Sequence, residues 1–363
     1  MSAISFSVKK SNDKFYIELK KRVNLYLTEN HFGKYANSMV VFKGLLFLFL
    51  FWGDYYLILR GYFLGHWLIL GYSLLAIFGL FVAFNISHDA THNTLTSSKL
   101  LNKFIFYLTF DPLGMSAYLW GFRHKFSHHI FPNVDDCDVD IDSNFLIRLS
   151  PNRPLLSHHR FQWLYAPILY LVYTLHWVFV KDIQYLFRKN LANLKNITHH
   201  PLIIFGVILS KILYLFYLIY IPIFWFQMDA QSVLLGFLAF HFTLSYVFLF
   251  TNIMNHHSME ADFPQRDSQG LLPGSWATHQ MATCLDFYPT SKFWNFFFGG
   301  FNAHCAHHLF PTICHTHYVE ISKIISQTAK EFNIEYKVTT WKKGIVSHFR
   351  HLHDLGRIAP NAM

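Results

Sequence analysis

The sequence predicts an all-α membrane protein in which two transmembrane hairpins carry one histidine-rich cytosolic body. Of its 363 residues, 53% are hydrophobic and 14% are charged, whereas soluble domains carry roughly a quarter charged residues. The 24 histidines outnumber the 21 acidic residues. Four cysteines in so long a chain favour a reducing compartment over a disulfide framework. This composition excludes a soluble enzyme, a disordered chain and a secreted disulfide scaffold.

Four apolar runs are long enough to cross a bilayer, which takes about 20 residues. They form two pairs, each joined by a short turn: residues 39–59 with 67–87, and residues 201–226 with 232–251. Two shorter apolar stretches are residues 100–119, interrupted by Asp111-Pro112, and residues 163–180, interrupted by Pro167 and His176. No repeat or linker divides the chain, so residues 1–363 are expected to form a single domain.

The basic residues predict the orientation in the membrane. Of the 30 Lys and Arg residues, only Arg60 falls in the hairpin turns, while Lys43 and Lys211 lie within predicted spans. By the positive-inside rule, the termini and the body, residues 88–200 and 252–363, are cytosolic. The membrane is a bacterial inner membrane or that of the endoplasmic reticulum. The net charge of +9 should attract anionic membrane lipids and acidic partners, and without a basic-aromatic module nucleic acid is not expected to bind.

Residues 1–38 form a basic amphipathic segment. Phe15, Leu19, Val23 and Tyr26 recur there at helical spacing. Two interpretations stay open: a helix that lies on the membrane surface, or an ordinary N-terminal helix that packs against the body.

Four histidine clusters are associated with the apolar segments or the C-terminal body. They are His88-Asp-Ala-Thr-His92, His124-Lys-Phe-Ser-His128-His129, Asn252-Ile-Met-Asn-His256-His257 and His304-Cys-Ala-His307-His308. Their imidazoles recur at spacings of three or four residues, which a helix places on one face. Neutral imidazole binds iron, zinc, copper and nickel, so the spacing predicts a metal site.

The number of clustered histidines predicts two metal ions. The candidate ligands are His88, His92, His124, His128, His129, His256, His304, His307 and His308. A structural zinc needs only four closed ligands. We expect His66, His176 and His241 to be packed core residues. Nine further histidines are expected at surfaces or interfaces: His158, His159, His199, His200, His315, His317, His348, His351 and His353.

Shared ligation constrains the topology, because all nine ligands must lie on one side of the bilayer. Residues 100–119 separate the first two clusters and therefore cannot span. Three apolar segments separate His129 from His256, so one of them must stay on the ligand side. Residues 163–180, with Pro167 and polar interruptions, are expected to be that segment. The prediction is four spans and two interfacial helices.

At these clusters the chain resembles the integral-membrane fatty acid desaturase and hydroxylase family, over roughly residues 39–320. The clusters that begin at His88 and His124 resemble the first two histidine boxes, and Gly299-Gly-Phe-Asn-Ala-His304-Cys-Ala-His-His resembles the third. Asn252 and His256 resemble the Asn-x-x-x-His pair of acyl-CoA desaturases. The flanks are most similar to the acyl-lipid and linoleoyl-CoA-type branch, in which His304 is usually glutamine, and no fused cytochrome b5 motif is present.

The resemblance implies a non-haem enzyme with two iron ions that uses O2 to desaturate a fatty acyl chain carried on a lipid, CoA or ACP. Electrons would come from a separate ferredoxin or cytochrome b5. A fatty acyl hydroxylase or acetylenase is the alternative on the same scaffold. A membrane metal transporter or sensor is the alternative from another class, although a transporter should place its ionisable ligands at mid-membrane.

Polar residues beside the boxes are candidates for supporting the ligands. A carboxylate can accept the far N–H of a ligating imidazole and fix its tautomer. The family carries acidic residues at positions that match Asp138 and Asp140, and Asp89 can do the same within the first box. Asn252 and His257 are candidates for a water-mediated or supporting role.

Overall fold

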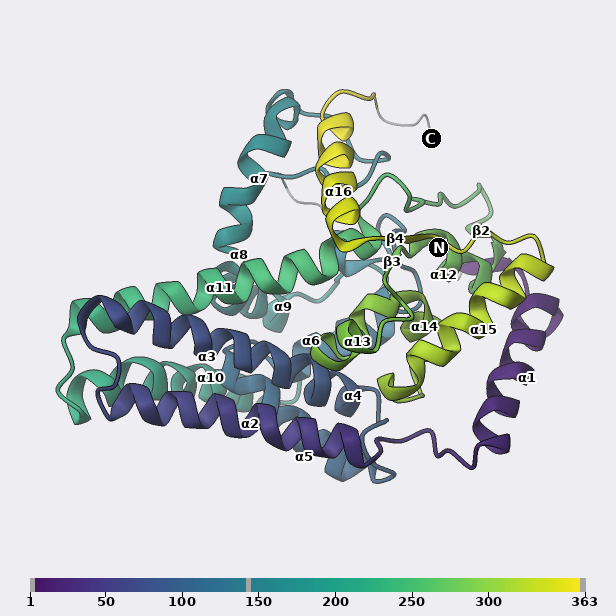
Figure 1. Ribbon diagram of the computed structural model, residues 1–363. Coiled ribbons are helices and arrows are strands. Elements are labelled where there is room, and N and C mark those ends of the chain that lie inside the picture. Colours follow the sequence, from purple (N-terminus) through teal and green to yellow (C-terminus); the bar gives the residue numbers. More distant parts are fainter. Residues whose placement is uncertain (1–3, 142–144, 360–363) are drawn as a thin grey trace.

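The computed structural model describes residues 4–141 and 145–359 (Figure 1). Four long apolar helices lie side by side, and a body of shorter helices lies at one end of them. The helices are α2 (Ser38–Leu59), α3 (Leu68–Val82), α10 (Pro201–Leu215) and α11 (Ala230–His256). Helices α3 and α10 continue in π-helical segments, giving the spans Gly65–Thr91 and Pro201–Trp225. The predicted pair of hairpins is confirmed, and both hairpin turns lie away from the body.

The helical bundle exposes a belt of large apolar side chains. Phe49, Leu202 and Trp225 are 73%, 72% and 74% exposed. Soluble monomers rarely expose large contiguous apolar patches, so this belt is the surface that faces lipid. In contrast to these exposed apolar side chains, the two lysines within the spans, Lys43 and Lys211, are buried inside the protein.

The segment predicted at residues 100–119 folds as two short helices, α5 (Lys99–Phe110) and α6 (Ala117–Arg123). Leu100 and Phe104 form an exposed apolar face on α5. This face suits a helix that lies in the membrane interface and does not cross it. No span is assigned to this segment among the described residues.

The second short apolar segment is a bent helical pair. Its halves, Ser157–Leu171 and Tyr173–Phe187, meet at 67°. They contain α7 (Gln162–Leu171), α8 (Tyr173–His176) and α9 (Asp182–Phe187). The bend lies at Val172, whereas Pro167, one of the two residues that interrupt the apolar stretch, sits inside α7.

The body joins segments that are far apart in the sequence. Its further helices are α4 (His88–Thr91), α12 (Trp276–Thr283), α13 (Lys292–Phe298), α14 (His304–Leu309), α15 (Tyr318–Glu331) and α16 (Trp341–Leu355). Two small parallel pairings, unforeseen from the sequence, join β1 (Ser5–Val8) to β2 (Leu271–Ser275) and β3 (Asp286–Phe287) to β4 (Val338–Thr339).

The N-terminal helix α1 (Lys14–Glu29) packs against α15. Phe15, Leu19 and Val23 are buried in this contact, and Arg22 forms an ion pair with Glu331 at 2.6 Å. The apolar face of α1 is therefore buried within the protein. Of the two interpretations of this segment, the packed helix is therefore correct.

Candidate metal centre

The nine predicted ligands come together in the body, at the ends of α3 and α11. His88, His92, His124 and His307 form one group, and His128, His256, His304 and His308 form a second group. Within each group the nearest ring nitrogens all lie within 4.8 Å of one another. His129 lies between the groups, beside His307 and His308. All nine side chains except that of half-buried His92 are buried.

The groups do not follow the sequence boxes, and a π-helical turn explains why for the second box. The segment His124–His128 is π-helical, and the His129 amide donates to the His124 carbonyl at 3.0 Å. This i→i+5 spacing brings the His124 and His129 rings together, with their Nε2 atoms 3.0 Å apart. His128 is turned towards the second group. The third box is also divided, since His307 joins the first group.

The second group is arranged for a cation. The Nε2 atoms of His256, His304 and His308 lie 2.8, 3.1 and 3.2 Å from one another. The Nδ1 of His256 donates to the Thr283 carbonyl and that of His308 to the Gln280 side-chain oxygen. A neutral imidazole carries one hydrogen, so both Nε2 atoms present lone pairs to the group. Ligand nitrogens at a right angle around a metal would be about 3.0 Å apart.

The first group fits a metal for a related reason. Both ring nitrogens of His88 and the Nε2 atoms of His92 and His307 are buried without a hydrogen-bond partner among the described residues. Buried polar atoms are normally paired, because an unpaired one costs free energy. A metal ion would supply a partner for one nitrogen of each ring, because a neutral imidazole has one lone pair to offer. The donor set of both groups therefore suits a borderline transition metal.

Burial keeps these imidazoles neutral. It lowers the pKa of His92, His304 and His308 well below the usual value, and neighbouring imidazoles lower it further. His128 differs: burial also lowers its pKa, but Asp138 and Asp140 outweigh that effect and raise it. Neutral imidazole is the form that binds metals.

Two of the predicted supporting carboxylates lie against a candidate ligand. Asp138 is buried, and both its oxygens lie 3.2 Å from the Nδ1 of His128. Asp140 lies 3.6 Å from the same nitrogen and forms an ion pair with Arg123 at 3.1 Å. The Nδ1–H of His128 is thus directed to carboxylate, which leaves its Nε2 free for the second group.

Asp89 is placed differently from the prediction. Its carboxylate accepts from the Nδ1 of His315 at 2.7 Å and from the Cys314 thiol at 2.9 Å, and among the described residues it has no hydrogen bond to a box histidine. The Nε2 of His315 lies 2.7 Å from the Lys43 ammonium. His315 is therefore not the surface residue that the sequence predicted. Asp89 instead ties the first box to the segment after the third box.

Several other histidines were also assigned wrongly. The side chains expected at surfaces or interfaces but found buried are His159, His317, His348 and His351. His66 and His176 are exposed, although both were expected in the core. His241 is buried as predicted and bonds to Thr174 and Tyr214. The neighbouring sequence of a histidine in an apolar segment thus does not predict whether its side chain is buried.

The sequence did not single out three of the groups that orient ligands. The Thr283 carbonyl and Gln280 hold His256 and His308, and the Tyr318 hydroxyl lies 3.3 Å from the Nδ1 of His307. These residues come from α12 and α15, far from the ligands in the chain. Gln280 alone had a signal, because the sequence Trp276-Ala-Thr-His279-Gln280 resembles the lead-in to the third box in acyl-lipid desaturases.

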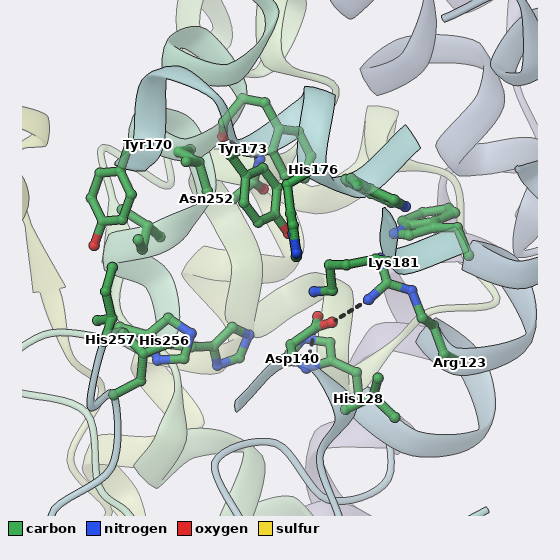
Figure 2. Close-up of a pocket in the computed structure, with 18 of the residues that line it drawn as sticks. Arg123, His128, Asp140, Tyr170, Tyr173, His176, Lys181, Asn252, His256 and His257 are labelled. Carbon is green, nitrogen blue, oxygen red and sulfur yellow. Dashed lines mark hydrogen bonds and ion pairs between the residues drawn. The ribbon is translucent and has the colours of Figure 1, made fainter. Parts of the chain in front are cut away.

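A cavity of about 460 Å³ opens beside the second group. Its wall includes the candidate ligands His128, His256 and His304, as well as Asn252 and His257 (Figure 2). Neither Asn252 nor His257 lies in the two groups of converging nitrogens. The Asn252 side-chain oxygen and the His257 Nδ1 are buried without a hydrogen-bond partner among the described residues. The Asn252 oxygen and the His257 Nδ1 are therefore available to a bound water or substrate.

Comparison with known proteins identifies the family. A family model described as fatty acid desaturase matches residues 63–340, which contain all nine histidines. This chain belongs to the fatty acid desaturase family. The family predicted from the histidine boxes is thereby confirmed.

This desaturase-family chain aligns with several curated desaturases over most of its length. It is 31% identical to the sn-1 linoleoyl-lipid 6-desaturase of Synechocystis sp., over 93% of this chain and 94% of the relative. It is 29% identical to the sn-1 linoleoyl-lipid 6-desaturase of Arthrospira platensis, over 89% and 87%. It is also 29% identical to the acyl-lipid (8-3)-desaturase of Physcomitrium patens, over 95% and 72%.

Proposed function

We propose that this protein catalyses the O2-dependent desaturation of a fatty acyl chain at a di-iron centre held by the nine histidines. The observation that carries the proposal is the convergence of the His256, His304 and His308 Nε2 atoms, two of which are committed to the lone-pair form. The family membership and the relatives named as lipid desaturases support iron and an acyl-lipid substrate.

The residues of the chain would bind and orient, and the metal would supply the oxidising chemistry. An unactivated CH2 group offers side chains no acidic proton or leaving group. Iron, when bound, would supply the oxidising chemistry that removes hydrogen from such a carbon with O2. Asp138, Gln280 and the Thr283 carbonyl hold the ligand rings in place. The largely apolar cavity beside His128 and His256 would hold the acyl chain and exclude water.

Two features beyond the site complete the proposal. Two electrons would come from an external ferredoxin or cytochrome b5, attracted by the net positive charge of the protein. The body and both termini would lie on the cytosolic side of a bacterial inner membrane or the endoplasmic reticulum, as the basic residues indicate. Asn252 and His257 would contact the centre through water.

Expression in a host of known lipid composition tests the proposal. The expected product has lost two hydrogens, and the purified protein holds two irons per chain. His307→Ala should abolish the product and reduce bound iron, because His307 belongs to the first group and borders His129. His66→Ala, at an exposed turn, is the matched control. A product that gains one oxygen would indicate a hydroxylase. A protein without tightly bound iron that moves metal across vesicles would refute the proposal.

A further inference from the structure

Apart from the candidate metal ligands and the Arg123–Asp140 ion pair, the cavity beside the second group has aromatic rings inside and polar side chains at its mouth. Rings of Trp120, Trp177 and Phe301 line its interior. Exposed His176 and Gln184 lie at the rim together with Phe145, which is 71% exposed. A molecule that fits this shape has a long apolar part and a polar end.

Lys181 is the cation at this polar end. Its Nζ lies 5.7 Å from the ring centroids of both Tyr173 and Tyr185. Among the described residues it has no hydrogen bond and no carboxylate within ion-pair distance. Figure 2 shows the Lys181 and His176 side chains directed into the same part of the cavity. The two aromatic rings and the electrostatic effect of the nearby Asp140 carboxylate therefore stabilise a charge that faces the cavity without a direct hydrogen-bond acceptor.

A second cation in the cavity wall, Arg123, differs from Lys181 because it has a carboxylate partner. Its guanidinium forms an ion pair with Asp140 at 3.1 Å and lies 4.7 Å from the Trp177 ring centroid. Asp140 is thus already paired, and it also lies 3.6 Å from His128. A cation that lines an apolar cavity gains most from a bound oxygen acceptor.

We propose that Lys181, assisted by His176, binds the carbonyl oxygen of the acyl ester and so fixes how far the acyl chain enters. The inference rests on the proposed function and names the residue that sets the position of the reaction. One end of the substrate is held at Lys181 and the metal groups are fixed, so the separation between them selects the carbons that react. Glycerolipid esters and acyl-CoA thioesters share this carbonyl oxygen.

Lys181→Met tests the proposal, because methionine keeps an unbranched chain and removes the charge. The unmodified protein should place its double bond at one position. The variant should make at least about tenfold less product per bound iron, or spread the double bond over neighbouring positions, the effect of losing a hydrogen bond to a charged group. Lys181→Arg should keep one position. Lys189→Met, an exposed lysine on the same segment, should match the unmodified protein.

Binding to iron-free protein in lipid nanodiscs separates this inference from the proposed function. Oleoyl-phosphatidylcholine and oleoyl-CoA are the two probes, and the tighter one identifies the carrier. Lys181→Met should weaken that binding about tenfold or more. If the unmodified protein makes no product yet binds a probe in this Lys181-dependent way, only the proposed function fails. Unchanged binding and double-bond position in Lys181→Met would overturn the inference, as would loss of bound iron in that variant.

Discussion

Asp138→Asn is the sharpest test of how the protein holds its second histidine group. The Asp138 carboxylate is buried and accepts hydrogen bonds from three donors. Its oxygens receive the Nδ1–H of His128 at 3.2 Å and the backbone amides of Asn133 and Asp140 at 3.0 and 2.9 Å. Asparagine has the same shape, but its amide nitrogen replaces one acceptor with a donor. One amide or His128 must then lose its partner, and the negative charge is gone.

The expected magnitude follows from these contacts. Loss of a residue that orients a metal-bound histidine typically lowers metal affinity about 10–100-fold. This range corresponds to about 1.4–2.7 kcal/mol. The first group has no contact with Asp138, so its metal should be unaffected. We therefore expect Asp138→Asn to lose one iron of two at a chelator concentration that the unmodified protein withstands.

The assay is iron per chain during chelator titration of the purified protein, with product yield measured in parallel. Asp136→Asn is the matched control. This residue lies in the same acidic loop, is 66% exposed and pairs with Arg153 at 2.9 Å. An exposed ion pair contributes at most about 1 kcal/mol, so the control should retain both irons. Equal chelator midpoints for Asp138→Asn and the unmodified protein would refute the reasoning.

Two further predictions concern stability. Iron-free protein should become less stable as pH falls below about 6.5, because buried His304 and His308 stay neutral in the fold while the unfolded chain takes up protons. Each such histidine contributes up to about 1.4 kcal/mol per pH unit, and an unchanged melting temperature between about pH 8 and pH 5.5 would contradict this. Gly299→Ala should lower the melting temperature and iron content, since Gly299 has φ +55° and a Cβ would lie 2.1 Å from the Phe84 carbonyl oxygen. The left-handed backbone alone costs alanine about 1–2 kcal/mol, whereas Gly206→Ala, with open space around its Cβ position, should melt near the unmodified protein.

Local pattern was enough to predict the spans and the residues that gather at the centre. A run of apolar residues must be helical in lipid, because no water is available for its backbone groups. The histidine boxes follow two of these runs directly, so His88 and His256 had to lie at the same end of the bundle. The requirement that all ligands share one side also placed α5 and the bent pair α7–α8 outside the set of straight spans.

The depth of individual side chains was not predictable from local pattern. The sequence predicted His176 in the core and His315 at a surface or interface, yet His315 is buried against Asp89 and His176 is exposed at a cavity mouth. Burial depends on which distant segments pack there. The same reason explains why α1 could not be assigned to the membrane or to the body until its contact with α15 was seen.

The sequence by itself determined that four apolar helices carry nine clustered histidines, since chain length, hydropathy and spacing are local properties. Only the tertiary structure decided how those histidines divide. A π-helical turn separates His128 from His124, and packing of α14 between the two groups sends His307 to one and His304 to the other. The tautomers of His256 and His308 also depend on the fold, because Thr283 and Gln280 of α12 accept hydrogen bonds from their Nδ1 atoms. Metal ligation depends on atoms brought together from distant segments, and local periodicity does not predict which of those atoms lie close together.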